Sequence, residues 1–312
     1  MTFRTATVSY THLPITSELG GVSPTIVVPG PWSSADIAFQ AENVATQKLH
    51  NAGFNCVACQ VLVLSADWPQ RTAFLQALQA TIAASTPRPL YYPGAKARLT
   101  EFQKGVTGQS SATPETANQC SIFFFNAGAN PIAETFEVFA PSLGVTELPA
   151  SDEEEFLIAA VNYANQSLAG TLGANILIHP QTLRKIGRRR LDEIIANLRY
   201  GTIAINAWTG LAFLLPQARW GAFPGHTLDD VQSGIGAVHN TMLFDRPQRT
   251  VVEAPFTPFP RNLLTLSFTL LPRPPWFITN RRANILGRLL TRFQAHPSFG
   301  KLFAIFANAL RG

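Results

Sequence analysis

Residues 16–58 read TSELGGVSPTIVVPGPWSSADIAFQAENVATQKLHNAGFNCVA, and the rest of the chain is organised around this stretch. Its apolar run Ser23–Val28 stops at a Pro-Gly-Pro turn, which is typical of a buried strand. Ser33 or Ser34 can cap a helix whose apolar residues recur on one face. The strand-like segment Gln60–Leu64 comes next. We therefore expect a strand, a helix and a second strand, the unit from which α/β sheets are built.

Two chemically active side chains flank this unit, each beside glycine. Glu18 precedes Gly20 and Gly21 at its start. Cys56 follows Gly53, where the backbone can bend, and comes just before the second strand. Each side chain is thus presented at the end of an element, and chemistry on open α/β sheets usually lies at such an end.

Strands and helices alternate along the rest of the chain, which predicts an α/β fold with a mostly parallel sheet and flanking helices. Residues 85–119 are rich in Pro, Gly, Ser and Thr, so a long loop is expected there. Helices are expected after a cap at Asp67, after a capping box at Ser151, and as one amphipathic helix over Leu183–Leu198. Further strands are expected at Ser121–Phe125, Ser142–Glu147, Ala174–Ile178, Tyr200–Asn206 and Val251–Glu253.

Three segments resemble motifs of the NAD(P)-dependent aldehyde dehydrogenase superfamily. Glu18–Pro24 reads ELGGVSP against the family's E-L-G-G-K-S-P, and Asn51–Ala58 reads NAGFNCVA against N-x-G-Q-x-C-x-A. Further on, Glu137–Pro141 reads EVFAP and resembles the family's E-x-F-G-P. Val22 stands where the family has lysine, and Phe54 stands where it has glutamine. These two departures bear on substrate range more than on reaction type.

The resemblance implies an enzyme that oxidises an aldehyde to a carboxylate with NAD or NADP as cofactor. In the family, the cysteine that matches Cys56 attacks the aldehyde carbon to give a thiohemiacetal, and hydride transfer to the nicotinamide leaves a thioester. The glutamate that matches Glu18 activates the water that hydrolyses this thioester. Glu137 and Phe139 match residues that hold the nicotinamide ribose and pack near the ring, and Leu19 is assigned to the cofactor site with them.

The resemblance covers about residues 14–256, which are expected to form the catalytic domain. Residues 1–13 match nothing in the family and are expected to be disordered. The family's N-terminal half, with most of the dinucleotide-binding domain and the asparagine that helps to hold the oxyanion, would lie upstream; Asn51 and Asn55 are not assigned that role. The chain is therefore expected to be the C-terminal portion of a longer enzyme, homo-oligomeric when full length and poorly active alone.

The composition is typical of a globular protein with a hydrophobic core. The chain has 312 residues, 46% of them hydrophobic and 14% charged, which is enough apolar sequence for a sizeable core. Its three cysteines, Cys56, Cys59 and Cys120, are too few for a disulfide framework and suit a reducing, cytoplasmic setting. The sequence shows neither a signal peptide nor a membrane-spanning run, and no nucleic-acid partner is expected.

Residues 257–312 form a proline-punctuated basic extension outside the resemblance. Eight Lys and Arg residues follow Glu253 and no acid does, whereas the whole chain has a net charge of +5. We interpret the extension as a helical pair that packs against the catalytic domain or a neighbouring subunit, because Pro and short apolar runs break any long amphipathic helix. Attachment to an anionic membrane surface is the alternative.

Other functions stay open at this point. One alternative is a non-catalytic fragment that presents a thiol or associates with subunits. Another is a cofactor-independent esterase that uses Cys56 and Glu18. Cys56 and Cys59 have the spacing of a redox pair or of half a zinc site, but redox pairs of that spacing open a helix and no second ligand pair is visible. Cys59 is therefore assigned to the core, and Cys120 to a structural role. The sequence identifies neither the aldehyde nor the choice between NAD and NADP.

Overall fold

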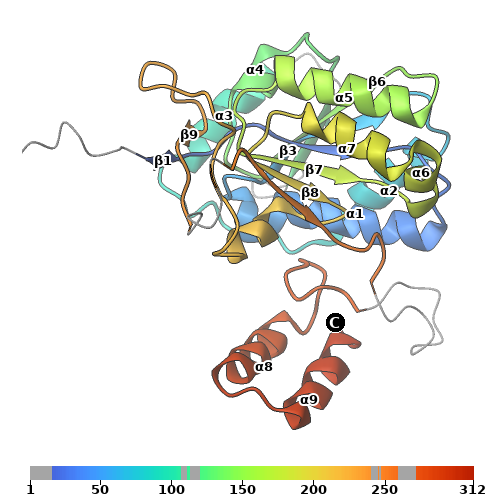
Figure 1. Cartoon of the computed structure of the whole chain (residues 1–312), viewed down its shortest axis with the longest axis vertical. Helices are drawn as coiled ribbons and strands as arrows, with labels where there is room; N and C mark the ends of the chain where they lie inside the picture. Colours follow the sequence, from blue (N-terminus) through green and yellow to red (C-terminus); the bar gives the residue numbers. More distant parts are fainter. Residues whose placement is uncertain (1–15, 107–110, 113–119, 240–244, 246, 259–271) are drawn as a thin grey trace, which may run out of the picture.

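The chain folds around an eight-stranded sheet in a computed structural model, which describes residues 16–106, 111–112, 120–239, 245, 247–258 and 272–312. The strands lie in the order β10-β8-β7-β2-β3-β6-β5-β4 (Figure 1). They are β2 (Ser23–Val27), β3 (Cys59–Ser65), β4 (Ser111–Ala112), β5 (Ser121–Phe124), β6 (Ser142–Leu148), β7 (Gly173–Leu177), β8 (Thr202–Ile205) and β10 (Thr250–Glu253). All neighbouring pairs are parallel except β4 with β5, which confirms the predicted fold class. The expected disorder of residues 1–13 lies outside the described residues.

Helices cover both faces of this sheet (Figure 1). Alternate residues of β2 explain why: Val27 packs with α1 and α2 on one face, and Ile26 packs with α5 and α7 on the other. A parallel sheet that is covered on both faces reads as near-continuous apolar runs, as the strands of this chain do. The helices are α1 (Ser34–Leu49), α2 (Arg71–Ala84), α3 (Ala95–Gly105), α4 (Pro131–Thr135), α5 (Glu153–Ser167), α6 (Pro180–Ile186) and α7 (Arg188–Ala196), with 3₁₀ helices at His50–Gly53 and Thr209–Leu214.

The opening strand–helix–strand unit forms as expected. Ser33 caps α1: its Oγ accepts from the backbone N–H of Asp36 at 3.1 Å, and the Asp36 carboxylate accepts from the backbone N–H of Ser33 at 2.9 Å. This reciprocal pair satisfies N–H groups that a helix start otherwise leaves without a partner. β2 and β3 then pair in parallel, so the segments that precede them come together at one edge.

The loop predicted over residues 85–119 is wrong for its middle part, because Ala95–Gly105 forms α3. Its buried residues Leu99 and Phe102 are spaced i, i+3, and Phe102 packs edge-on to Phe123 with ring centroids 5.4 Å apart. The first residue of α3 follows Gly94, and no side chain caps the start. Tertiary packing of two apolar side chains, and not a local start signal, therefore holds this helix in place.

Three helix boundaries also differ from expectation. Leu183–Leu198 is two helices, α6 and α7, because Gly187 adopts φ 85° and ψ 142° between them. Asp67 does not cap α2; its carboxylate accepts from the backbone N–H of Ala150 instead. The cap of α5 is Asp152, one residue after the predicted Ser151, and it accepts from the N–H of Glu155 at 2.8 Å.

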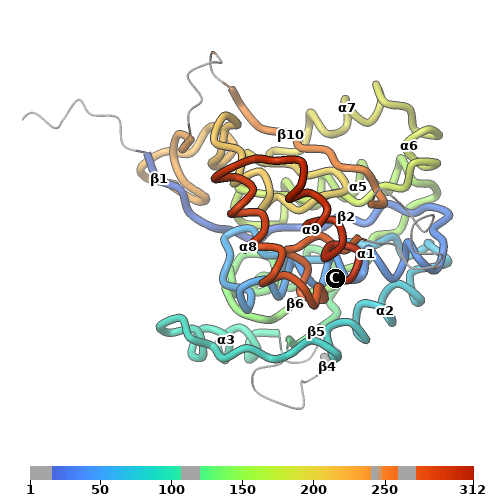
Figure 2. The backbone as a smooth tube through the Cα atoms, turned by 90° about the horizontal axis from the view of Figure 1, so that it is seen from below, coloured from blue at the N-terminus to red at the C-terminus, as the bar shows by residue number. Residues whose placement is uncertain are grey.

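The basic extension contains two helices, α8 (Ala283–Ala295) and α9 (Phe299–Ala309), which pack on each other outside the α/β body (Figure 1). Figure 2, seen from below, shows this pair on the side of the body where α1 lies. Within the part of the chain that the structure describes, no helix combines the length and the apolar character needed to cross a bilayer.

Candidate active site

Side chains from the segments that precede three parallel strands come together at the amino edge of the sheet. Glu18 lies in the short strand β1 (Ser17–Glu18), which pairs with β9 (Gly234–Ile235) and leads into β2. Cys56 lies in the turn before β3, and Glu137 and Phe139 lie before β6. Because β2, β3 and β6 are parallel neighbours, the residues that precede them converge. Open α/β sheets usually bind ligands at the carboxyl ends of their strands. The sequence predicted that Glu18 and Cys56 lie at that usual edge; they lie instead at the amino ends of the strands.

These side chains line one open cleft of about 610 Å³. Every residue that the sequence assigned to catalysis or to the cofactor faces this space. The lining residues are Glu18, Leu19, Gly20, Cys56, Tyr92, Pro93, Ala95, Arg98, Glu137 and Phe139. Leu19 leaves 47% of its surface exposed, which makes it an apolar contact available to a ligand.

A left-handed bend presents Cys56 to the cleft. Residues 51–53 all have positive φ, and a Cβ on Gly53 would lie 2.9 Å from the Ala140 backbone. Burial raises the pKa of the Cys56 thiol to about 12, and the negative charge of Glu18 and a hydrogen bond to its carboxylate add to the rise. The thiol is therefore protonated at neutral pH, and it becomes a nucleophile only when a base takes its proton.

A buried tryptophan holds the Glu18 carboxylate. The indole Nε1–H of Trp220 donates to Oε1 of Glu18 at 3.0 Å, and Trp220 is only 1% exposed. Its ring packs against Phe213 and His239, with ring centroids 5.3 Å and 6.5 Å away. The sequence carries no signal for this contact, because 202 positions separate its two partners. Trp220 can therefore orient Glu18 toward the thiol.

Glu137 is a half-buried carboxyl group on the other wall. Burial raises its pKa to about 7, although the Arg98 guanidinium and a hydrogen bond from the Gly21 backbone oppose the rise. Near neutral pH this carboxyl group is thus shared between its protonated and ionised forms. A Cβ on Gly20 would lie 2.1 Å from Oε1 of Glu137, so the glycine of the ELGG segment makes room for this side chain.

An aromatic cluster borders the cleft next to Glu137. Phe139, with φ 46°, has its ring centroid 5.7 Å from that of Phe54 and 5.2 Å from that of Tyr92. Phe54 also meets Tyr91 edge-on at 5.0 Å and is 5% exposed. The phenylalanine that replaces the family's glutamine therefore packs in a hydrophobic cluster and does not offer a polar group to the cleft.

Arg98 and Tyr92 line the cleft but come from the segment predicted to be a loop. Arg98 donates from Nε to the backbone carbonyl of Glu137 at 2.7 Å, and its guanidinium lies over the Phe136 ring, 4.3 Å from the centroid. Tyr91 and Tyr92 stand together before the Pro93-Gly94 turn, and two adjacent aromatic residues at a turn could have indicated Tyr92 as a binding residue. Nothing local distinguishes Arg98 from a solvated helix arginine.

The remaining polar candidates have other partners. Asn51 Nδ2 donates to the carbonyl of Phe54, and Asn55 Nδ2 donates to the carbonyl of His50 at 2.6 Å, so both amides stabilise their own turn. Cys59 is fully buried against α1 and α2, and all three cysteines are free thiols. Among the described residues, no group of His, Cys, Asp and Glu could hold a metal ion.

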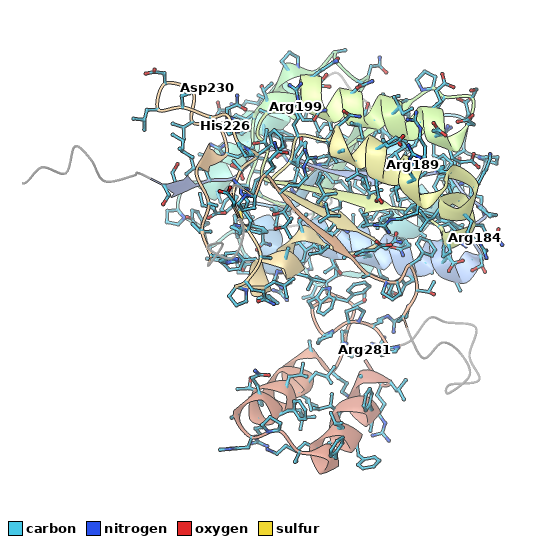
Figure 3. All side chains as sticks on the ribbon, in the orientation of Figure 1. Arg184, Arg189, Arg199, His226, Asp230 and Arg281 are labelled. Carbon is cyan, nitrogen blue, oxygen red and sulfur yellow. The ribbon has the colours of Figure 1, made fainter. Side chains whose placement is uncertain are left out.

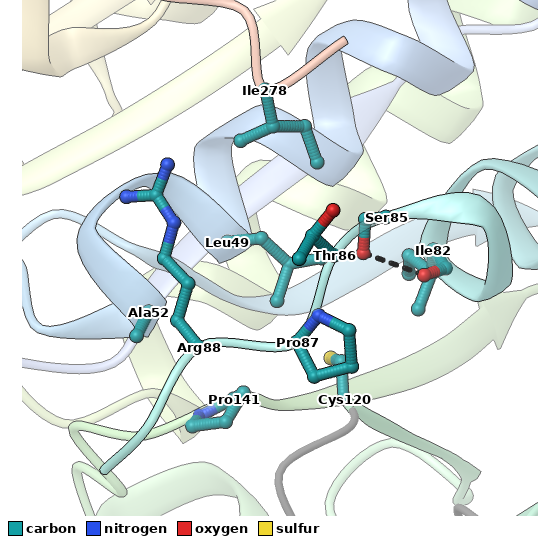
Figure 4. A pocket seen from close by; sticks show the side chains of 10 residues that line it. All are labelled: Leu49, Ala52, Ile82, Ser85, Thr86, Pro87, Arg88, Cys120, Pro141 and Ile278. Carbon is teal, nitrogen blue, oxygen red and sulfur yellow. Dashed lines mark hydrogen bonds between the residues drawn. The ribbon is translucent and has the colours of Figure 1, made fainter.

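Cys120 lines a separate pocket of about 140 Å³ beside the end of α2 (Figure 4). Arg88, Leu49, Pro141 and Ile278 contribute to its walls. None of the residues that line the larger cleft reaches this pocket. It is therefore not part of the candidate active site.

No family model matches the sequence, and no curated protein does. Solved structures do match. A gamma-glutamyl-gamma-aminobutyraldehyde dehydrogenase from Burkholderia cenocepacia is 22% identical with a TM-score of 0.55, over 72% of this chain and 44% of that one. An oxidoreductase from Marinobacter aquaeolei is 19% identical with a TM-score of 0.57, over 75% of this chain and 46% of that one.

A third match is an aldehyde dehydrogenase C mutant from Pseudomonas syringae in complex with NAD+ and octanal. It is 19% identical with a TM-score of 0.55, over 74% of this chain and 46% of that one. The chain thus spans less than half the length of the structures it resembles. Its α/β body has the fold of the aldehyde dehydrogenase catalytic domain.

Proposed function

We propose that this chain is the catalytic portion of an NAD(P)-dependent aldehyde dehydrogenase, which oxidises an aldehyde to a carboxylate through a thioester on Cys56. The observation that carries the proposal is the meeting of Cys56, Glu18 and Glu137 in one cleft of a chain with this fold. That a solved structure of the same fold holds NAD+ and an aldehyde, octanal, supports the reaction class.

Cys56 supplies the nucleophile and Glu18 the base. The Glu18 carboxylate lines the same cleft as the thiol and interacts with it, so the thiol proton can pass to that carboxylate while Sγ forms a bond to the aldehyde carbon. When bound, the cofactor supplies the hydride acceptor that takes the carbon to the oxidation level of a thioester. Glu18 next releases the thiol proton to solvent and, as a carboxylate again, takes a proton from the water that attacks the thioester carbon. The C–S bond breaks, the product acid leaves, and the thiolate of Cys56 takes a proton back from Glu18.

The cleft has groups that fit the nicotinamide end of a cofactor. The Glu137 carboxyl group can bind ribose hydroxyls, because its pKa near 7 leaves it able to accept and to donate hydrogen bonds. Phe139 offers an aromatic surface and Leu19 an exposed apolar one. Only these three residues are assigned to the cofactor. We therefore expect slow NAD-dependent oxidation by this chain alone, because positioning is most of what a protein contributes to hydride transfer.

The same pair of residues supports hydrolysis of an activated ester without any cofactor. Attack by Cys56 and activation of water by Glu18 need only these two side chains, which line the same cleft. This second candidate function gives the test that does not depend on cofactor binding.

The test is to purify the chain and follow hydrolysis of a nitrophenyl ester and NAD-dependent oxidation of an aldehyde panel. Cys56→Ala should abolish both reactions, and Cys59→Ala is the matched control that should keep most of the activity. Glu18→Gln removes the base for both steps while burial still raises the thiol pKa, so this variant should be acylated by the ester slowly and should hydrolyse the thioester more slowly still.

Each outcome is decisive. Equal losses in the two cysteine variants would reopen the paired-cysteine hypothesis. Ester hydrolysis that survives Cys56→Ala would contradict the assigned nucleophile. A chain that is folded but neither alkylated at Cys56 nor acylated by the ester would be the non-catalytic fragment.

A further inference from the structure

The α8–α9 hairpin is fastened to the body at its base and free at its tip. Arg273 binds Glu42 of α1, with Nε 2.6 Å from Oε2 and Nη2 3.0 Å from Oε1. The same guanidinium donates from Nη1 to the carbonyl of Gly312 at 3.1 Å, so the segment that follows α9 returns to the base. Phe277 packs on Phe39 of α1, with ring centroids 5.3 Å apart. The turn between the two helices lies on the side away from the body (Figure 1).

One face of α9 is aromatic and uncovered. Phe299, Phe303 and Phe306 are spaced i, i+4 and i+7, which places them in one stripe along the helix. Their exposed fractions are 87%, 80% and 57%, and α9 has no buried residue. Exposed phenylalanines in a contiguous stripe mark an interaction surface more often than isolated exposed apolar residues do.

The charged side chains of the hairpin and its base are of one sign. No acidic residue follows Glu253, and the cations that belong to the hairpin and its base are Arg273, Arg281, Arg282, Arg288, Arg292, Lys301 and Arg311. Of these, Arg273 is ion-paired with Glu42, and Lys301 donates to the carbonyl of Arg292 at the end of α8. The other arginines form no ion pair within the described part of the chain. Figure 3 shows Arg281 beside the hairpin, and Arg184 and Arg189 far from it on α6 and α7.

The aromatic stripe and the positive charge together indicate which partner can cover this face of α9. A second copy of the hairpin would bring like charges together, which opposes association. The helices, of 13 and 11 residues, are too short to span a bilayer, which takes about 20 residues. A basic helix with an aromatic face instead suits the boundary between lipid headgroups and acyl chains, where the rings insert and the arginines bind phosphates.

We propose that the α8–α9 hairpin docks on an anionic phospholipid membrane surface, with the Phe299–Phe303–Phe306 stripe at the acyl boundary and the arginines of α8 against the headgroups. The base at α1 then holds the α/β body above the membrane. The interaction does not depend on the proposed catalytic activity, since no residue of the cleft takes part in it.

The test measures binding of the whole chain to sedimenting vesicles of phosphatidylcholine, with and without about one third phosphatidylserine. We expect binding to the anionic vesicles only, weakening as salt rises because surface charges are screened. Replacing the three phenylalanines of the stripe by serine should lower the partition coefficient by about tenfold or more. Leu214→Ser with Leu228→Ser is the control, since these leucines are 70% and 69% exposed elsewhere on the chain.

Two double variants that change the net charge equally test whether binding depends on the arginines of α8 or on the charge of the whole chain. Arg288→Gln with Arg292→Gln should weaken binding several-fold, whereas Arg184→Gln with Arg189→Gln, which changes the net charge equally, should not. Equal binding to neutral vesicles, equal effects of the two arginine pairs, or no binding at low salt would each overturn the proposal. A chain that ignores vesicles but forms a dimer that the serine replacements dissociate would show that the stripe is a self-association surface.

Discussion

The α/β body and the α8–α9 hairpin are built from similar apolar residues but use them in opposite ways. In the body, every residue of β2, β3, β7 and β8 is buried. In the hairpin, Leu286 is the only buried residue of α8, and α9 has none. The body therefore specifies its side chains through packing with one another, which also fixes the cleft. Most of the hairpin's side chains, those of α9 above all, are under no such internal constraint, so their pattern points to something outside the described chain.

The largest expected difference between the two regions is in stability. Phe156 is fully buried between α5 and the sheet, whereas Phe303 is 80% exposed. Phe156→Ala should lower the free energy of unfolding by about 3–5 kcal/mol through lost burial and a cavity. Phe303→Ala should change it by no more than about 0.5 kcal/mol. Urea denaturation of both variants measures this, and comparable losses would mean that the hairpin stripe is covered in solution.

A smaller effect concerns pH, because the hairpin has no acidic side chain, whereas the body half-buries Glu137 and raises its pKa. Its folded pKa, about 7, lies above the ordinary value of 4.5, so this group stabilises the fold fully below pH 4.5 and progressively less as pH rises through 7. Glu137→Gln should remove that loss, about 2–3 kcal/mol between pH 4.5 and pH 8.

The measurement for Glu137 is the free energy of unfolding across that pH range for the native chain, for Glu137→Gln and for the surface control Glu193→Gln. The native chain and the control should lose stability in parallel as pH rises. A Glu137→Gln curve that falls just as steeply would contradict the raised pKa of this half-buried carboxyl group.

The smallest predicted effect is on ester turnover, and it tests whether Trp220 orients the Glu18 carboxylate. Trp220→Phe keeps a ring in the cluster with Phe213 but removes the hydrogen bond to Glu18. Ester turnover should fall about tenfold with little change in KM, since one hydrogen bond to a charged group contributes about 1.5–3 kcal/mol. Trp68→Phe also removes an indole hydrogen bond, of 3.1 Å to the uncharged carbonyl of Gly30, and should leave turnover unchanged. Equal effects of the two substitutions would reduce Trp220 to a packing role.

Much of the fold could be predicted because its signals are local. The apolar run of β2, the serine cap of α1 and the bend before Cys56 each depend on neighbouring residues. The failures have physical causes of two kinds. α3 has no cap and is held by Leu99 and Phe102, which pack on distant residues. The helix breaks at Gly187 because this residue adopts a non-helical backbone conformation, and the amphipathic pattern continues across it and so gives no sign of the break.

The sequence by itself determined the α/β class, the order of the strands along the chain, and the carboxyl and thiol groups to examine. Only the tertiary structure decided that these groups share the amino edge of the sheet, that Trp220 and Arg98 join them, and that α9 leaves its phenylalanines uncovered. The reason is the range of the interactions. Caps, bends and periodicity act over a few residues, whereas burial, pKa shifts and exposed stripes depend on which distant segments come into contact.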